Sequence, residues 1–486
     1  MTRSRYKIAI VGSGFAGIGM ATKLLSAGET NFVVLEKSNQ VGGTWRDNTY
    51  PGAACDVPSH LYSFAGIPNS SWSRSFSPQP EIQEYLVRCA KDQGVLDKTR
   101  FGCQVSLVEW NEADCLWTLS TSQGTLEAKF LVLATGALSE PSIPQLSGIE
   151  KFLGKTFHSA SWDHSYDLTH KRVAVVGTGA SAIQFVPQIA PVVDKLYLMQ
   201  RTPPWIMPRT DRKLTRIESL LFKKVPLLQR TARSAIYWAR ELFVVGFAFD
   251  RRVMKIGEKI ALRHLYSQVK SQELRDKLTP SYTLGCKRVL ISSDYYPSLE
   301  RPNVVVETSG IQEINPTSIT TQGGDTYEVD AIIFGTGFHV TDLPVAEFVV
   351  GRDGVNLREA WKEGMHAHKG TCVPGFPNLF FLVGPNTGLG HTSQVFMIEC
   401  QINYVQKALK EMDSFSEKAC LEVEPDAEQT WNDKVQEMLK GTVWTSGGCQ
   451  SWYLDEFGRN TTLWPRFTWQ FWLETRNFDM NNYKVS

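Results

Sequence analysis

The chain has 486 residues, which is too many for one ordinary hydrophobic core and predicts about three folding units. Apolar residues make up 42% and charged residues 21%, as in soluble globular proteins, and the net charge of +1 excludes a strong field for nucleic acid. No apolar run reaches the ~18 residues that a membrane span requires, so we expect no transmembrane segment.

The first predicted unit is a strand, a glycine-rich turn and a helix in "YKIAIVGSGFAGIGMATKLLSAG". Its glycines allow a tight turn, backbone approach to a pyrophosphate and close packing of the helix on the strand. The next strand, "FVVLEK", ends on an acid that can accept the hydroxyls of a ribose. A βαβ unit without a ligand is the alternative. The residues expected at this dinucleotide site are Gly12, Gly14, Phe15, Ala16, Gly17 and Glu36.

The same pattern recurs in "KRVAVVGTGASAIQFVPQIA". Here the following strand, "KLYLMQR", ends on Arg201, at the same offset from the turn as Glu36 in the first unit. A guanidinium can bind a ribose 2′-phosphate that a carboxylate would repel, so the second site is predicted to hold NADPH. A solvated surface arginine is the alternative. The residues expected at this site are Thr178, Gly179, Ala180, Ser181, Ala182, Gln184 and Arg201.

Two further apolar strands end in Thr-Gly, in "KFLVLATGALS" at 129–139 and "DAIIFGTGFHVTD" at 330–342. Such strands are typical of flavoproteins with two dinucleotide sites, at the points where the chain passes between domains. The partner of NADPH at the first site is therefore most simply FAD. The predicted fold class is α/β, with two Rossmann-like dinucleotide-binding domains of the FAD/NAD(P) flavoprotein type and a helical insertion in the NADPH domain.

The predicted organisation alternates between the two domains. The FAD-binding domain comprises residues 1–148 and 345–486, and the NADPH-binding domain comprises 149–208 and 286–344, with the insertion at 209–285 between them. Near the end, "FPNLFFLVGPNTGLGHTSQVFMIEC" predicts a buried strand, a loop and a helix that starts near Thr392 and faces the flavin.

The insertion is strongly basic. Between residues 209 and 263 there are 14 Lys and Arg against 5 Asp and Glu, a net charge of +9. A basic amphipathic segment of this kind can touch a membrane surface. We favour the simpler interpretation, a helical subdomain with a solvated basic face.

The nine cysteines are scattered along the chain, without a CxxC pair or a Cys/His cluster. This usage predicts reduced cytoplasmic thiols, with neither a disulfide framework nor a metal site.

Two stretches resemble the signatures of type I Baeyer–Villiger monooxygenases, in the flavin-containing monooxygenase superfamily. "FLGKTFHSASWDH" follows the pattern F-x-G-x-x-x-H-x-x-x-W-D, and "GGTWRDNTYPGAACD" ends on Asp56. Monooxygenases that oxygenate nitrogen or sulfur typically lack the tryptophan. The resemblance implies that His158 and Trp162 form a strap that holds the two domains in register.

The resemblance also implies the chemistry. NADPH reduces the flavin, oxygen forms a C4a-peroxyflavin, and one oxygen atom is inserted next to a ketone carbonyl to give an ester or lactone. Arg288 would be the catalytic cation and Asp56 its carboxylate partner, while Lys287, Arg201 and Thr202 would surround the 2′-phosphate. A structural ion pair and a surface acid are the alternatives for Arg288 and Asp56.

Further site residues follow from the same resemblance. Trp452 matches the tryptophan of a mobile loop that folds over NADP, so we expect residues 441–455 to become ordered when NADP binds. Arg466 stands where a smaller residue is expected, which changes the shape of the substrate pocket. The remaining cofactor-binding residues expected are Gly43, Thr44, Trp45, Tyr62, Val105 and Gln394.

Three other functions remain open at this point. An oxygenase of sulfur or nitrogen would not need Arg288, and a pyridine-nucleotide disulfide reductase would want a redox cysteine pair near the flavin. A redox-sensing protein that binds FAD without catalysis is the third. We expect a ketone and molecular oxygen as the small-molecule partners, whereas the sequence leaves the oligomeric state open, with a monomer among the alternatives.

Overall fold

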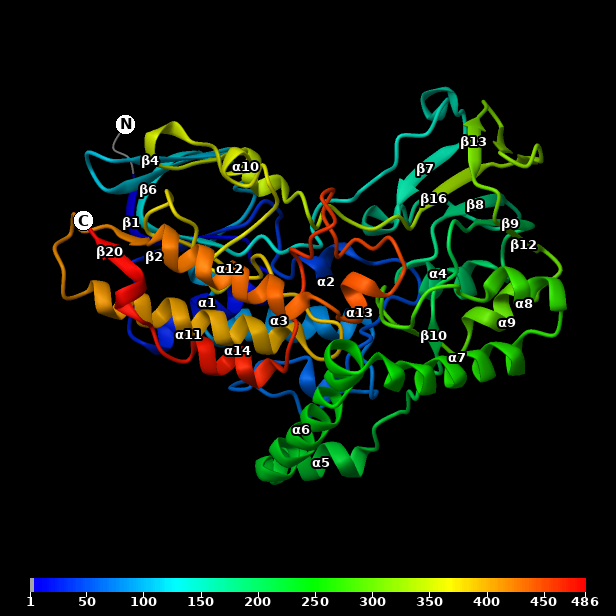
Figure 1. Cartoon of the computed structure of the whole chain (residues 1–486), viewed down its shortest axis with the longest axis horizontal. Coiled ribbons are helices and arrows are strands. Elements are labelled where there is room, and N and C mark those ends of the chain that lie inside the picture. The colour runs from blue at the N-terminus through cyan, green and yellow to red at the C-terminus, as the bar shows by residue number, and fades with distance from the viewer. Residues whose placement is uncertain (1–3) are drawn as a thin grey trace.

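An eight-stranded sheet forms the core of the left half of the molecule (Figure 1) in the computed structural model, which describes residues 4–486. The strand order is β17-β4-β5-β6-β1-β2-β3, and β18 also pairs with β6. The strands are β1 (Ser4–Val11), β2 (Phe32–Leu35), β3 (Thr99–Arg100), β4 (Val105–Asn111), β5 (Leu116–Thr121), β6 (Gly124–Leu133), β17 (Val349–Val350) and β18 (Leu379–Phe381).

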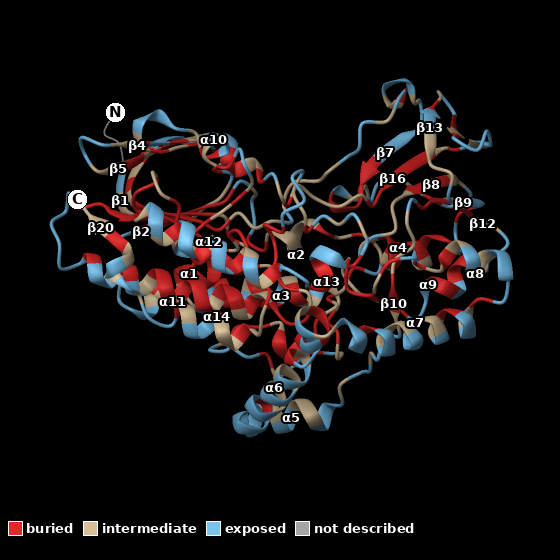
Figure 2. Cartoon of the chain, in the orientation of Figure 1, coloured by how far each residue is buried: buried red, intermediate tan, exposed pale blue. Residues whose placement is uncertain are grey.

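Strand β1 lies between β2 and β6 and is parallel to both. Its residues Ile8, Ala9 and Ile10 are fully buried, because a strand inside a parallel sheet is covered on both faces. Helices α1 (Phe15–Ser26), α3 (Gln79–Asp92) and α11 (Gln394–Met412) pack against one face of the sheet, where Figure 2 shows their inner sides buried. Helices α12 (Pro425–Leu439) and α14 (Thr468–Thr475) lie further out, and α10 (Leu357–Ala360) lies near β4 (Figure 1).

A second, five-stranded parallel sheet forms the right half of the molecule, in the order β12-β9-β8-β16-β7 (Figure 1). Helices α4 (Ala182–Ile189) and α9 (Tyr295–Leu299) pack together beside it. The strands are β7 (Lys155–His158), β8 (Arg172–Val176), β9 (Lys195–Met199), β12 (Val304–Glu307) and β16 (Ala331–Phe334).

Three small sheets complete the strand pairing. They are β10 (Ile206–Met207) with β11 (Leu290–Ile291), β13 (Ile311–Ile314) with β14 (Ser318–Thr321) and β15 (Thr326–Glu328), and β19 (Leu421–Val423) with β20 (Tyr483–Val485).

The glycine-rich turns of the two main sheets pack in the same way. Gly12 follows β1 with φ +101°, and a Cβ there would lie 2.6 Å from the carbonyl oxygen of Ala134, just beyond β6. Gly177 follows β8 with φ +104°, and its Cβ would lie 2.5 Å from the carbonyl oxygen of Gly335, just beyond β16. The two Thr-Gly strands therefore end directly against the two turns, where only glycine fits.

The stretch expected to be helical forms four α-helices, of which the first two project from the lower side of the molecule (Figure 1). They are α5 (Arg216–Lys224), α6 (Pro226–Glu241), α7 (Met254–Gln268) and α8 (Gln272–Leu278). Thr215 and Glu218 form a capping box at the start of α5, which explains why the helix begins there. Within residues 4–486 no helix is both long and apolar enough to cross a membrane.

The helix expected to start near Thr392 begins at Gln394 instead. The hydroxyl of Ser393 accepts a hydrogen bond from the backbone N–H of Val395 and caps the first turn.

Candidate functional site

The first glycine-rich turn leaves a backbone cradle at the start of α1. A Cβ at Gly17 would lie 1.9 Å from the carbonyl oxygen of Gly12, so the helix packs closely on the turn. Gly14 caps α1 without a side-chain hydrogen bond, and a Cβ on Gly43 would come within 3.1 Å of its Cα. The glycines therefore leave bare backbone at the N-terminus of the helix, the arrangement that lets a pyrophosphate approach closely. Phe15 and Ala16 are buried in the first turn of the helix.

Glu36 follows β2 and is 4% exposed. Its carboxylate accepts hydrogen bonds from the backbone N–H groups of Ser13 and Ser38 at 3.0 and 2.9 Å, and from Arg46 at 2.9 Å. Burial by itself would raise the pKa of Glu36, but these hydrogen bonds and the charge of Arg46 hold it below its ordinary value. The carboxylate of Glu36 is therefore an ionised acceptor. The hydroxyls of a ribose would donate to it in place of some of these groups.

Aromatic side chains gather beside this cradle. The indole of Trp45 donates to the hydroxyl of Tyr62 at 3.0 Å, and the ring of Phe15 lies edge-on to Tyr62 at 5.1 Å. Trp45 belongs to the short helix α2 (Thr44–Asp47), which Gly43 precedes. Of the other expected residues, Val105 is buried at the start of β4 and Gln394 opens α11, donating to the carbonyl of Thr387.

The second glycine-rich turn lies beside two cations. Burial lowers the pKa of Lys287, and the nearby charge of Arg201 lowers it further. Neither side chain has a carboxylate partner within the part of the chain that the structure describes. Two neighbouring cations without an anion form a site for a phosphate group. Thr178 donates to the carbonyl of Thr202 at 3.2 Å, and the turn residues Gly179 and Ala180 are exposed.

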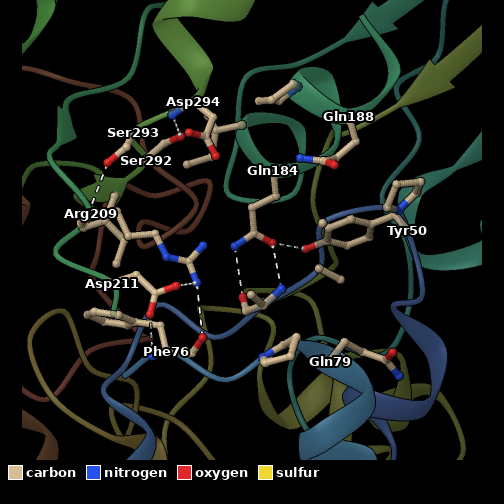
Figure 3. A pocket seen from close by; sticks show the side chains of 18 of the residues that line it. Tyr50, Phe76, Gln79, Gln184, Gln188, Arg209, Asp211, Ser292, Ser293 and Asp294 are labelled. Atoms are coloured by element: carbon tan, nitrogen blue, oxygen red, sulfur yellow. Dashed lines mark hydrogen bonds and ion pairs between the residues drawn. The ribbon is translucent and has the colours of Figure 1, made fainter. Parts of the chain in front are cut away.

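Gln184 on α4 points toward the first domain rather than along the turn (Figure 3). Its amide oxygen accepts from the hydroxyl of Tyr50 at 2.9 Å, and its amide nitrogen donates to the carbonyl of Ala54 at 3.0 Å. These contacts lie at a polar cavity of about 650 Å³ between the domains, which Arg209 and Asp211 also line. A cofactor contact of Gln184 stays a prediction, as do those of Ser181 and Ala182.

The expected catalytic pair, Asp56 and Arg288, is brought together from positions 232 residues apart. Nε of Arg288 lies 2.7 Å from Oδ2 of Asp56 and Nη2 lies 2.8 Å from Oδ1, so the contact is bidentate. The remaining Nη1 is 3.4 Å from the carbonyl oxygen of Leu389, in the loop before α11. The two side chains keep 23% and 30% of their surface exposed, so a ligand can reach them.

A third charge lies beside the pair. Arg240, on α6, donates to the backbone carbonyl of Asp56 at 3.2 Å. Burial alone would raise the pKa of the Asp56 carboxyl, but the charge and hydrogen bonds of Arg288, with the charge of Arg240, keep it below its usual value. The pKa of Arg288 is raised, chiefly by the charge of Asp56. Arg288 therefore pairs with the carboxylate and Arg240 with the backbone carbonyl of the same residue, and the three side-chain charges sum to +1.

Sequence reasoning missed Arg240 and Tyr453 at this site. Tyr453 is fully buried, and its pKa rises to about 12 because of burial, with the charge of Arg288 opposing the rise. Its position next to Trp452 in "SWYLDEFG" was the available signal. Arg240 lies among many basic residues of the insertion, and nothing in the sequence distinguishes it from them.

The stretch expected to form an interdomain strap packs mainly on the second domain. Trp162 is partly buried, and its ring lies 5.2 and 5.3 Å from those of Phe157 and Phe185, against a core cluster that also includes Tyr50 and Ala53 of the first domain. His158 is buried at the end of β7 beside Phe338, and burial lowers its pKa to about 4. His164 of the same stretch also contacts the first domain, since its Nε2 lies 2.8 Å from the hydroxyl of Thr49.

The prediction that all cysteines are reduced is wrong for one pair. Cys286, two residues before Arg288, forms a disulfide with Cys449 across 163 residues of sequence. The seven other cysteines are free. Spacing along the chain could not reveal the pair, because the fold alone brings the segment before Arg288 against the loop that carries Trp452. Trp452 itself is 44% exposed, and its ring lies tilted against that of Tyr453 with the ring centres 4.3 Å apart.

The chain is similar to a known protein family and to several known proteins. The family described as pyridine nucleotide-disulphide oxidoreductase matches residues 9–225. A "Baeyer-Villiger monooxygenase" of Streptomyces coelicolor is 49% identical over 479 residues, which cover 99% of this chain and 92% of that protein. One of the same name from Pseudomonas aeruginosa is 49% identical over 482 residues, covering 99% and 91%.

Among solved structures, a crystal structure of OTEMO in complex with FAD and NADP is 26% identical and covers 100% of both chains, with a TM-score of 0.89. The predicted fold class, with two Rossmann-like domains, is confirmed.

Proposed function

Because this chain belongs to the Baeyer–Villiger monooxygenase family, we propose that Arg288, held by Asp56, promotes the insertion of one oxygen atom next to a ketone carbonyl. The protein is an FAD-dependent monooxygenase that uses NADPH and molecular oxygen and forms an ester or a lactone. The family and activity predicted from the two signatures are thereby confirmed.

The bidentate Asp56–Arg288 pair is the observation that carries the residue assignment. When bound, the flavin supplies reducing equivalents taken from NADPH and activates oxygen. What the chain must supply is a fixed positive charge where negative charge develops on the substrate oxygen. A guanidinium suits this role because it stays protonated even when it is desolvated.

Asp56 has two effects on Arg288. It fixes the plane of the guanidinium through two hydrogen bonds, and it neutralises part of the positive charge. Arg240 restores that charge, because it adds a second cation near the same aspartate. We therefore assign Arg240 to the site as a positioning residue that keeps the cluster at a net charge of +1.

The two cradles fit the two cofactors. The turn at Gly12 and Gly14, with Glu36, would hold the pyrophosphate and ribose of FAD, and Trp45 with Tyr62 would line the flavin. Arg201 and Lys287 would hold the 2′-phosphate of NADPH. These assignments rest on the backbone cradle at Gly12 and Gly14 and on the two unpaired cations.

The activity is tested with purified protein, FAD, NADPH and oxygen, on cyclic, linear and aryl ketones and on an aryl methyl sulfide. NADPH consumption is followed by absorbance, and products are identified by gas chromatography with mass spectrometry. We expect an ester or a lactone from at least one class of ketone. Sulfoxide formation with no ester from any ketone would contradict the assignment and favour a heteroatom oxygenase.

Three further expectations stay proposals. The first is the domain division at 148, 208, 285 and 344, which is supported by the two separate main sheets. The second is a monomeric state. The third is a cytoplasmic location, for which the Cys286–Cys449 disulfide is an unusual feature.

A further inference from the structure

Exposed apolar side chains are concentrated in one small part of the molecule. Fourteen of the 25 large apolar residues exposed in residues 4–486 lie between 217 and 260, in less than a tenth of the chain. Large apolar side chains gathered at the surface mark contact sites for proteins or membranes. The hairpin of α5 and α6 carries the outermost group, which we call the hairpin patch: Ile217, Leu220, Leu221, Val225, Leu227 and Leu228.

The hairpin patch lies at the tip of the projection. Figure 1 shows α5 and the start of α6 below the rest of the chain, and Figure 2 shows this tip largely exposed. Ile217 and Leu227 expose 71% and 70% of their surface. The simpler interpretation of the insertion, a helical subdomain with a solvated basic face, does not account for aliphatic side chains that are this exposed.

Cations surround these aliphatic side chains. Between residues 212 and 230 there are 6 Lys and Arg and one acid, a net charge of +5. That acid, Glu218, is already paired with Arg212. Within the described chain no ion pair involves the other exposed cations near the tip, which are Arg216, Lys223, Lys224 and Arg230.

The hairpin is held in place from its other side. Gln229 is 5% exposed and donates to the carbonyl of Asn69 at 2.7 Å, Arg233 donates to the carbonyl of His60 at 2.6 Å, and Phe222 packs on the ring of His60. The face toward the protein is therefore occupied, and the hairpin patch is left facing outward in a fixed orientation.

From this arrangement we propose that the hairpin patch docks on the surface of an anionic phospholipid bilayer. Lipid phosphates are complementary to the unpaired cations, and the boundary between headgroups and acyl chains accommodates the leucine and isoleucine side chains. A second copy of this chain in a two-fold contact would set one patch of charge +5 against another. Nucleic acid would pair with the cations but leave the aliphatic side chains in water. The protein would lie on the membrane without crossing it.

The test is co-sedimentation of the FAD-loaded full-length protein with vesicles. One set contains phosphatidylcholine alone, and the other contains phosphatidylcholine with phosphatidylglycerol. We expect much stronger binding to the anionic vesicles, weakened by salt. Each lysine near a charged bilayer contributes about fivefold to partitioning, so Lys223→Glu with Lys224→Glu should reduce binding more than tenfold. Ile217→Ser with Leu227→Ser should reduce it by at least tenfold as well.

A matched control replaces two exposed apolar residues outside the insertion, Ile143→Ser with Leu153→Ser, which are 51% and 80% exposed. This variant should bind vesicles like the unmodified protein. Circular dichroism and FAD content establish that each variant is folded. Equal binding to both kinds of vesicle, or unchanged binding of the Ile217/Leu227 variant, would overturn the proposal. So would self-association, measured by sedimentation velocity, that the patch variants abolish while vesicles fail to bind.

Discussion

At the scale of single residues, the proposed role of Arg288 beside Asp56 is to stabilise negative charge on the substrate. A guanidinium ~4 Å from a developing negative charge stabilises it by ~4 kcal/mol at an effective dielectric of ~20, which corresponds to roughly 10³-fold in rate. The bidentate contact with Asp56 orients the guanidinium, and in the proposed arrangement Arg240 offsets the charge of the aspartate.

Replacement of this arginine tests the role directly. Arg288→Ala should retain FAD and consume NADPH, more slowly, while losing about 10³-fold in ester formation and releasing hydrogen peroxide instead. Asp56→Ala should impair the same step less, because the cation remains but is no longer oriented. Product analysis and a peroxide assay, run beside NADPH consumption, separate the two steps. Ester formation by Arg288→Ala at a near-normal rate would show that another group carries the charge.

Arg201 is expected to decide between NADPH and NADH. A charge-assisted contact to phosphate contributes ~1.5–3 kcal/mol, so Arg201→Ala should raise the KM for NADPH by roughly 10- to 100-fold. The KM for NADH should hardly change, because NADH has no 2′-phosphate. Steady-state kinetics with both nucleotides provides the measurement. Equal losses with the two would mean that Arg201 supports the fold rather than the phosphate.

At the scale of elements, the C-terminal loop is tied to the site by a covalent bond. Cys449 is bonded to Cys286, and the backbone N–H of Thr283 donates to the carbonyl of Gly447 at 3.0 Å. The short helix α13 (Val443–Ser446) precedes this anchor, and Trp452 follows it. The mobile segment expected at 441–455 is therefore fixed near its middle, so NADP is expected to act mainly on the part after Cys449.

Hydrogen exchange with and without NADP tests this division. We expect residues 450–455 to gain protection when NADP binds, and residues 441–447 to be protected in both states. Reduction with dithiothreitol should speed exchange in both parts when NADP is absent. Cys449→Ser should reproduce the reduced behaviour and be insensitive to dithiothreitol. Identical protection of 450–455 in the two states would argue against a loop that responds to NADP.

At the scale of the whole molecule, the two main sheets form the binding sites of the two cofactors with the same kind of glycine turn. Each central strand ends in a glycine with positive φ, pressed against the end of a neighbouring strand. The domains meet through polar contacts that include Gln184 with Tyr50, His164 with Thr49 and Arg288 with Asp56, but each glycine turn packs on a strand of its own sheet. Replacing the glycine of one turn should therefore impair the binding of that domain's cofactor and leave the binding of the other cofactor intact.

A pair of matched substitutions tests that separation. Gly12→Ala should give a protein without FAD, because its Cβ would meet the carbonyl of Ala134 at 2.6 Å in a backbone conformation that alanine avoids. Gly177→Ala should bind FAD and be yellow, yet NADPH should reduce it poorly. Absorbance spectra and anaerobic reduction by NADPH distinguish the two variants. Loss of FAD from both would mean that the domains do not fold independently.

The sequence by itself determined the two dinucleotide-binding units, the switch from Glu36 to Arg201 and the family. These depend on local rules, since a glycine turn, the helix after it and the charge at the next strand end all lie within one βαβ unit. The pairing of Asp56 with Arg288 followed only from the resemblance. Tertiary structure alone decided which segments surround that pair. It placed Arg240 and Tyr453 beside it, joined Cys286 to Cys449 and left the hairpin patch exposed, because contacts between distant segments depend on packing that no local pattern encodes.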